Sequence, residues 1–382
     1  MSNNDIIFIP IKLIYDFEGF SYSDNTSHIH STFCPSTSGD YMSLPSSQPL
    51  SHLEPGIRLL HKSVGFIFQA ALRAAIKLKL AEHLQDGPQT AKQIAQKIEA
   101  NATMIHKILR LLATQNIFTA VDKHQFAMTP EAEFLLADHP HSLHKAVLML
   151  TDKTLWEPSL HVAEMALGEP IFKRIFGESF FEYWERNANL PHNFHDGMAS
   201  FSTLENPFIT AKYPFPENSL IADIGGGTGG LLLGVLDANP KTEGVLFDMK
   251  AVTDKHILHK LNDDSRWKIE NGSFFEKVPS ADFYLLKSIC RDWDDDHLIQ
   301  ILTTIRQSMT KTSKVLLIDI HLSHDNQPNF GKNLGLLCSH LIIGADERTQ
   351  EELEILLQQA GLKTTNILKT DCDLSILEAQ IG

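Results

Sequence analysis

The sequence predicts an α/β protein with a mainly parallel sheet, preceded by a smaller helical region. Three observations lead to this fold class. From residue 220 onward, short apolar runs alternate with helical patterns; a glycine-rich turn at residues 225–230 follows the first run; and residues 53–150 show only short helices and one hairpin. Alternating strands and helices form parallel sheets covered on both faces, and ligands bind at the carboxyl ends of the strands.

The composition is that of a globular protein long enough for two domains. The chain has 382 residues, 43% hydrophobic and 21% charged, with a formal net charge of -14. This acidity, without a long Lys/Arg run, argues against a nucleic-acid partner. Four scattered cysteines without CxxC spacing predict reduced thiols in a cytoplasmic protein. No apolar run is long enough for a membrane span, so no membrane partner is expected.

The N-terminal part is predicted to contain two different segments. Residues 1–52 are rich in Ser, Thr, Asn, Pro and His, which predicts a disordered extension. Residues 53–150 are expected to form a separate helical domain, which begins with apolar residues at helical spacing over 57–80.

Two short helices and a hairpin follow within this domain. Thr90 is expected to cap a helix over 91–98, and Asn101 or Thr103 a second helix over 104–113. Apolar runs at 118–121 and 125–128 flank a turn, so the order is that of a winged helix. Winged helices often bind DNA, but the candidate recognition helix has only Lys107 and Arg110 as strong cations. A dimerisation or lid role is therefore favoured.

Residues 151–382 are expected to form the catalytic domain, which begins with an aromatic-rich helical segment over 151–212. Most of these aromatic side chains are expected to pack in the core. A minority are candidates to line an apolar pocket for a flat substrate, namely Trp184, Phe194 and, beside them, Met198.

The remaining elements follow from the alternating pattern. The predicted strands are residues 221–224, 245–247, 283–286 and 315–320, and the predicted helices are residues 231–238, 297–309 and 349–360.

The glycine-rich turn predicts a nucleotide-type cofactor. Glycines at 225, 227 and 229 permit positive φ and close approach of a ligand, and Asp248 at the end of the next strand can bind a ribose diol. Asp223, just before the turn, would repel a pyrophosphate and attract a cation. S-adenosylmethionine (SAM), which carries an ammonium and a sulfonium, is therefore favoured over NAD. The alternative is a tight turn without a ligand.

Further segments resemble one enzyme family. Residues 271–279 read NGSFFEKVP, residues 286–295 read LKSICRDWDD, and residues 347–349 read ERT. Together with the winged helix and the glycine turn, they resemble the plant and fungal small-molecule O-methyltransferases, a metal-independent SAM family of secondary metabolism. The resemblance covers roughly residues 55–380. It implies a Rossmann-like SAM-binding domain, an N-terminal dimerisation domain, an intertwined homodimer and a small-molecule substrate.

The resemblance also assigns cofactor-binding positions. It implies that Gly225 and its neighbours hold the methionine end and that Asp248 holds the ribose. Ser273 and Phe274 fall where the family contacts adenine, and Lys287 where it also touches the cofactor. The family usually has Asp at the position of Ser273, and a hydroxyl binds the adenine amino group more weakly than a carboxylate.

One position departs from the family in a way that affects the chemistry. The family has a general-base His where this chain has Arg291, followed by Asp292. Arginine stays protonated and accepts no hydrogen bond, so it cannot be that base. The family's two flanking acids fall at Asp319 and Glu347, which are expected to pair with Arg291.

Three functions are compatible with these residues. The Arg-Asp pair resembles the leporin-type SAM-dependent pericyclase, in which the methyl group is not transferred; that enzyme also uses a histidine, for which His141 and His144 are candidates. This interpretation is slightly favoured. The second is O-methyl transfer to an acidic hydroxyl on a hydroxylated aromatic or polyketide-type substrate, and the third is a non-catalytic SAM-binding dimer. The histidine spacing matches no standard zinc motif, so no metal is expected.

Overall fold

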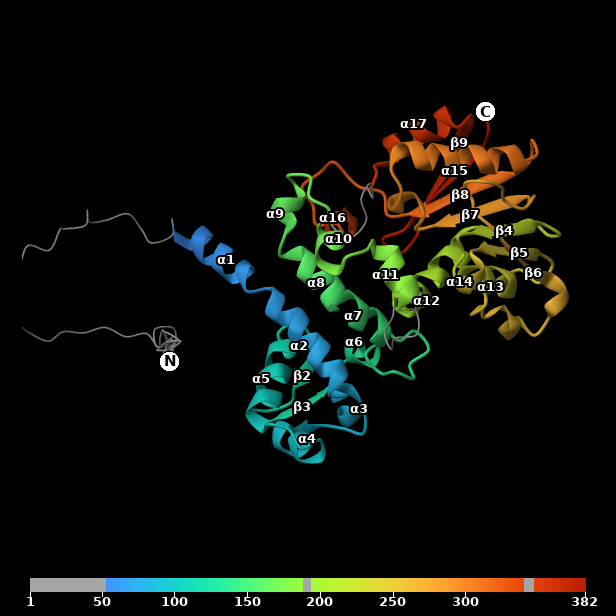
Figure 1. The fold of residues 1–382 in the computed structure, drawn as a ribbon. Coiled ribbons are helices and arrows are strands. Elements are labelled where there is room, and N and C mark those ends of the chain that lie inside the picture. The colour runs from blue at the N-terminus through green and yellow to red at the C-terminus, as the bar shows by residue number, and fades with distance from the viewer. Residues whose placement is uncertain (1–52, 188–193, 340–346) are drawn as a thin grey trace, which may run out of the picture. The chain divides into compact units, whose positions relative to one another are not determined.

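The computed structural model describes residues 53–187, 194–339 and 347–382 (Figure 1). Leu59–Gly382 form one compact unit. The predicted disordered extension, residues 1–52, lies outside the described residues. Within the described ranges, no helix is both long enough and apolar enough to cross a membrane.

The helical region predicted over 57–80 is interrupted twice. It forms α1 (Glu54–Ser63), α2 (Phe66–Lys77) and α3 (Leu80–Leu84). The first interruption is at Gly65, and glycine is a poor helix former. The second is at Lys79, whose φ of 52° is left-handed and cannot continue a right-handed helix.

The next elements form the predicted winged-helix arrangement. Thr90 caps α4 (Ala91–Lys97) in a capping box, and the Asn101 side chain caps α5 (Ala102–Ala113). The hairpin strands β2 (Phe118–Ala120) and β3 (Gln125–Met128) join β1 (Gln89–Thr90) in a small antiparallel sheet of order β1-β3-β2. Buried leucines and isoleucines of these helices, with Phe118, form the core of this part.

Among the described residues, seven helices connect this region to the large sheet. They are α6 (Pro130–Glu133), α7 (His144–Leu150), α8 (Lys153–Ser159), α9 (Val162–Met165), α10 (Ile171–Phe176), α11 (Phe180–Arg186) and α12 (Phe194–Lys212). Helix α12 packs against α7 at Gly197, where a Cβ would lie 2.5 Å from Met149. Only glycine permits this close approach of the two helices.

The large sheet has seven strands in the order β6-β5-β4-β7-β8-β10-β9 (Figure 1). Its strands are β4 (Leu220–Ile224), β5 (Glu243–Asp248), β6 (Trp267–Asn271), β7 (Phe283–Lys287), β8 (Lys314–Asp319), β9 (Leu362–Lys369) and β10 (Ser375–Ile381). The strands from β6 to β8 pair in parallel, whereas β10 pairs antiparallel with both β8 and β9. The mainly parallel α/β sheet predicted from the sequence is confirmed, and β6, β9 and β10 are additions to it.

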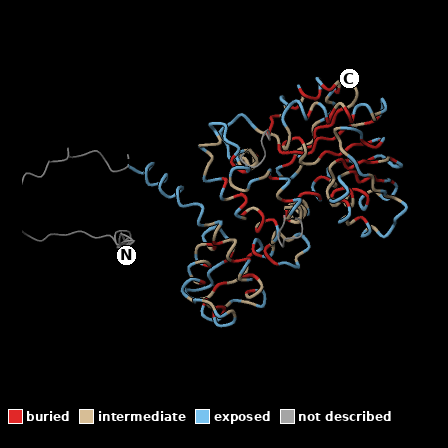
Figure 2. The backbone as a smooth tube through the Cα atoms, viewed as in Figure 1, coloured by how far each residue is buried: buried red, intermediate tan, exposed pale blue. Residues whose placement is uncertain are grey.

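Helices cover both faces of this sheet, as the alternation predicted. On one face, Ala222 and Leu317 belong to a core completed by α15 (Asp295–Ser308) and α17 (Gln350–Gln359). On the other face, Ile221 and Leu316 pack with α12 and α13 (Gly230–Ala238). Short helices α14 (Lys250–Thr253) and α16 (Phe330–Ser339) follow β5 and β8. The buried trace in Figure 2 runs along the central strands.

Candidate functional site

The glycine turn after β4 is closed beneath and open on one side. Gly225, Gly227 and Gly229 have φ values of 65°, 61° and 83°, a region that favours glycine. A Cβ at Gly225 would lie 2.6 Å from Cδ1 of Ile289, whereas a Cβ at Gly227 would meet no atom within 4 Å. The backbone at Gly227 therefore remains accessible to a ligand. Ile289, which contacts the turn at Gly225, was not identified from the sequence.

Asp223 lies beneath this turn rather than at its mouth, which corrects the prediction. Its side chain is buried, and a Cβ at Gly226 would lie 2.6 Å from its Cγ. Burial raises the pKa of Asp223 to about 7; the charge of Asp248 adds to the shift, and the Leu232 amide and Lys287 oppose it. Asp223 therefore supports the turn and does not present a permanent charge to a ligand.

Asp248 ends β5 beside the turn, where the sequence placed it. Its Oδ2 accepts a hydrogen bond from Gly227 N at 2.9 Å, and its Oδ1 accepts one from Met249 N at 2.6 Å. Burial raises the pKa of Asp248, and the two amide hydrogen bonds oppose that shift. A carboxylate has about four acceptor sites, so it can still accept hydrogen bonds from a diol. His195 on α12 interacts electrostatically with Asp248, a neighbour that the sequence did not reveal.

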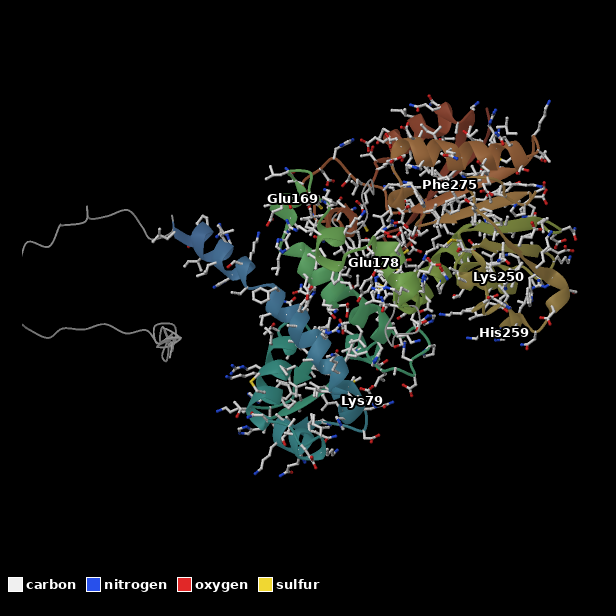
Figure 3. The ribbon with its side chains drawn as sticks, viewed as in Figure 1. Lys79, Glu169, Glu178, Lys250, His259 and Phe275 are labelled. Atoms are coloured by element: carbon white, nitrogen blue, oxygen red, sulfur yellow. The ribbon has the colours of Figure 1, made fainter. Side chains whose placement is uncertain are left out.

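Phe274 lies on the same side of the turn, after β6. A carbon of its ring is 3.6 Å from the position of a Cβ on Gly225. It contacts the rings of Phe275 and Trp293 with centroid separations of 5.0 and 5.8 Å (Phe275 is labelled in Figure 3). The hydroxyl of Ser273 accepts a hydrogen bond from Phe275 N at 3.3 Å. Of the two predicted adenine-contacting residues, Phe274 therefore lies next to the turn, and Ser273 precedes it directly in the chain.

Lys287 ends β7 and connects the sheet to α12. Its Nζ donates to Ser202 Oγ at 2.9 Å and lies 2.6 Å from Glu205 Oε2. The side chains of Lys287 and Glu205 are only 9% and 11% exposed, so the pair is largely removed from water. Ser202 and Glu205 were not identified from the sequence, because nothing in a helical segment marks a polar residue as facing a strand end 85 or 82 positions later.

The residue after Glu205 supplies an acceptor next to the turn. Asn206 is buried, and its Oδ1 has no hydrogen-bond partner among residues 53–187, 194–339 and 347–382. Its side-chain nitrogen lies 3.4 Å from the position of a Cβ on Gly230, the first residue of α13. An unpaired buried acceptor is costly, so a ligand that donates hydrogen bonds would be stabilised here. Together with the Asp248 carboxylate, this acceptor fits a ligand with an amine and a diol, and SAM has both.

A second group of side chains surrounds the short 3-10 turn Cys290–Asp292, which follows β7. Arg291 is buried and donates a hydrogen bond to the Asp319 carboxylate at the end of β8. Burial opposes the charge of Arg291, but Asp319 and Asp292 outweigh that effect and raise its pKa. Arg291 is therefore a permanent cation, and the predicted pairing with Asp319 is present.

Asp292 is the group of this turn that titrates near neutral pH. Burial of its carboxyl raises the pKa to about 7; Arg291 opposes this shift, and the charges of Asp319 and Glu347 add to it. Glu347 is buried against Gly335 of α16, where any side chain would collide with it. Asp292, Asp319 and Glu347 thus interact electrostatically in one group with Arg291, whereas the expected pairing of Glu347 with Arg291 stays a prediction.

Arg348 holds this turn in place and was missed by sequence reasoning. Its guanidinium donates to the carbonyls of Cys290 at 2.7 Å and Trp293 at 2.8 Å, one on each side of the Arg291-Asp292 pair. Its Nε donates to the Asp295 carboxylate at 2.9 Å. The side chain is only 4% exposed, so these bonds form away from water.

The hydrogen-bond contacts described for His141 and His144 are to residues outside the group around Arg291. His141 is exposed and its Nδ1 lies 2.9 Å from the carbonyl oxygen of Thr203 on α12. His144 begins α7, with its Nδ1 3.3 Å from the carbonyl oxygen of Leu135. The expectation that one of them completes the Arg291 site stays a prediction.

The three candidate pocket residues have different surroundings. Trp184 and Phe194 belong to an aromatic cluster with Phe172 and Phe180, against which Leu337 of α16 packs. Met198 is half-buried one helical turn after Phe194 on α12. The first two therefore serve core packing at least in part.

The cavities do not by themselves define a substrate pocket. One of about 10 Å³ adjoins Arg291, Asp319 and Glu347, too small for an organic substrate. Another of about 570 Å³ is lined by residues of α4 and α5, including Lys107 and Arg110, in the winged-helix part. Across the described ranges, no group of three or more His, Cys, Asp or Glu could hold a metal ion.

Comparison with known proteins connects both parts of the chain to one group of enzymes. The O-methyltransferase domain matches residues 160–363, and the O-methyltransferase dimerisation domain matches residues 60–138. A phenazine O-methyltransferase from Lysobacter antibioticus is 30% identical over 329 residues, which cover 84% of this chain and 95% of that protein.

Two solved structures are also similar. A methyltransferase of calicheamicin biosynthesis, in its SAH-bound form, has a TM-score of 0.80 and 33% identity and covers 86% of this chain and 99% of its own. An O-methyltransferase from neocarzinostatin biosynthesis, in complex with S-adenosyl-L-homocysteine (SAH) and 1,4-dihydroxy-2-naphthoic acid, has a TM-score of 0.66 and 26% identity and covers 85% and 98%.

Proposed function

Because the chain belongs to the small-molecule O-methyltransferase family, we propose that it methylates a hydroxyl group on a flat, hydroxylated aromatic compound of secondary metabolism. The cofactor is SAM, whose product SAH is bound in two similar structures. The dihydroxynaphthoic acid in one of them, and the aromatic cluster around Trp184 and Phe194, support a flat substrate. This assignment places ordinary methyl transfer ahead of the pericyclase interpretation favoured by the sequence alone.

The residues at the glycine turn fit SAM. Asp248 would hold the ribose diol, Phe274 and Ser273 would flank the adenine, and Asn206 Oδ1 offers an acceptor to the ammonium. Bound there, SAM supplies a methyl group on a sulfonium that a nucleophilic oxygen can attack. The chain must therefore hold the substrate hydroxyl in line and remove its proton.

We propose that Asp292 is the proton acceptor. The observation that supports this role is the raised pKa of its carboxyl group. Its pKa of about 7 means that the carboxylate and the acid coexist near neutral pH, which suits a general base. Arg291 cannot accept the proton, but its fixed positive charge next to Asp292 would stabilise the oxyanion that forms. Asp319 holds Arg291 in position through their hydrogen bond.

Incubation with methyl-labelled SAM and a panel of phenols, naphthols and hydroxyquinones tests this function. We expect label in the product and one SAH formed per product. In Asp292→Asn, the rate should fall by a factor of about 10²–10⁴, the usual contribution of a general base. Equal turnover by wild type and Asp292→Asn would contradict the assigned base.

A second candidate function is suggested by Arg291 alone. A buried, permanently charged guanidinium at this position favours activation of a substrate carbonyl in a pericyclic rearrangement without methyl transfer. The same labelled incubation separates the two functions. Rearranged product without label and without SAH would support the pericyclase.

We further propose that residues 53–150 form a dimerisation domain and residues 151–382 the catalytic domain. Two chains would associate through residues 53–150 to form a homodimer. Helices α1 and α2 and their junction expose the apolar residues Leu59, Leu60, Val64, Phe66 and Ile67. A second copy would remove this apolar surface from water. Light scattering at micromolar concentration should give twice the chain mass of 42.9 kDa.

A further inference from the structure

The buried ion pair at the end of β7 lies beside the cofactor turn. Lys287 is the last residue of β7, which pairs directly with β4, and the glycine turn begins after the last residue of β4. Glu205 reaches Lys287 from α12, at 2.6 Å. The next residue of α12, Asn206, contacts the start of α13, which follows the turn. Both charges of the pair are therefore next to the place where the cofactor binds.

Lys287 acts electrostatically on this turn. Burial raises the pKa of Asp223 beneath the turn, and the positive charge of Lys287 is among the effects that lower it again. Because the lysine is largely buried, its charge is weakly screened by solvent. Glu205 supplies a second buried charge of opposite sign, which offsets the contribution of Lys287 to the potential at the turn.

The charge of the two cofactor forms makes this potential selective. SAM carries an ammonium, a sulfonium and a carboxylate, and so has a net charge of +1 at neutral pH. SAH lacks the sulfonium charge and is net neutral. A positive potential at the turn therefore disfavours SAM, while it changes the binding of SAH much less.

We propose that Glu205 neutralises Lys287 and thereby sets the preference of the cofactor site for SAM over its demethylated product, SAH. This inference rests on the proposed use of SAM but does not depend on which reaction follows. Glu205 acts through Lys287 and is a positioning and charge-compensating residue. Asn206 beside it is neutral and cannot replace it.

The test measures the dissociation constants of SAM and SAH by isothermal titration at low salt for four forms of the full chain. The forms are wild type, Glu205→Gln, the double variant Glu205→Gln/Lys287→Met, and Glu205→Asp. In Glu205→Gln, the ratio of the SAM to the SAH dissociation constant should rise roughly tenfold, the order of magnitude expected for one weakly screened, uncompensated unit charge near the cofactor. The double variant has no excess charge and should return the ratio to within about threefold of wild type, even where the loss of the Lys287 contact weakens the binding of both ligands, and Glu205→Asp should keep the wild-type ratio.

A surface pair provides the matched control. Glu217 pairs with Lys241 at 2.8 Å, but both side chains are more than 60% exposed. Glu217→Gln should leave the ratio unchanged, because solvent screens the released lysine.

Four outcomes would overturn the inference. Equal weakening of SAM and SAH in Glu205→Gln would indicate a purely structural role, and unchanged dissociation constants for both ligands would show that the charge of Lys287 does not affect the cofactor. If Glu205→Gln does not fold, the double variant and Glu205→Asp still test the inference: a ratio in either that differs from wild type by tenfold contradicts it. Failure of wild type to bind SAM at all would reject the proposed cofactor along with the inference, whereas SAM binding with an unchanged ratio rejects the inference alone.

Discussion

Replacing Arg348 by alanine should both destabilise the protein and impair its reaction. The guanidinium donates to two backbone carbonyls, of Cys290 and Trp293, and to the Asp295 carboxylate. The two carbonyls would each lose a buried donor, at about 1–3 kcal/mol apiece. The Asp295 side chain is 66% exposed, so its ion pair adds at most about 1 kcal/mol. We expect a loss of about 2–7 kcal/mol in the free energy of unfolding, centred near 4 kcal/mol.

The effect on the reaction follows from the position of the turn. Arg348 fixes both ends of the segment that carries Arg291 and Asp292, and a shift of about 1 Å in a reacting group can lower the rate by about 10²-fold. SAM affinity should change by less than about threefold, because the glycine turn makes none of these contacts. A fall in kcat at constant SAM affinity therefore distinguishes positioning from general loss of structure.

Urea unfolding, SAM titration and turnover of Arg348→Ala, Arg348→Lys and Asp295→Ala are the measurements. Arg348→Lys can reach one carbonyl and should recover part of both losses, while Asp295→Ala should lose no more than about 1 kcal/mol. Added guanidinium should partly restore turnover in Arg348→Ala. The reasoning is refuted if Arg348→Ala unfolds within 1 kcal/mol of wild type, or if Asp295→Ala is as damaging.

Three further predictions follow from the same site. The pH profile of kcat/KM should rise with pH through a midpoint near 7, because the raised pKa of Asp292 delays formation of the active carboxylate, and Asp292→Asn should lose that step. Asp248→Ala should weaken SAM binding by about 1–3 kcal/mol in calorimetry, since the diol loses its acceptor, and unchanged affinity would exclude Asp248 from the ribose site. Gly225→Ala should lower the free energy of unfolding by at least about 1–3 kcal/mol, because its φ is 65° and its Cβ would lie 2.6 Å from Ile289; a neutral result would mean that the turn can rearrange.

What the sequence could predict was mostly local. The glycine turn and the ends of β4 and β5 are each defined by a few consecutive residues, and the structure has them where the pattern placed them. The sequence placed Asp223 at the mouth of the turn, whereas its side chain is buried beneath the turn. The position of a residue in the chain does not distinguish these two locations. Successive side chains of a strand point to opposite faces of the sheet. The packing of α13 against β4 therefore decides on which side of the turn the Asp223 carboxyl lies.

The contacts that were missed join distant segments. Glu205 meets Lys287 only because α12 passes the end of β7, and Arg348 meets Cys290 only because β8 brings the two segments together. Neither pairing has a spacing that a single sequence reveals. Arg291, in contrast, could be identified from the sequence, because the family resemblance marks its position. Its residue type alone excludes a role as general base.

The order of strands in the large sheet also bears on how the protein avoids aggregation. Its two outer strands, β6 and β9, present unpaired backbone groups that another chain could extend. On β6, Lys268 and Glu270 form a salt bridge at 2.7 Å, and β9 carries the exposed Lys363 and Lys369. Burying these charges under an added strand would be unfavourable, so strand-to-strand growth is discouraged at both edges. In the homodimer proposed above, self-association would instead use the apolar residues exposed on α1 and α2, where it can end with a pair.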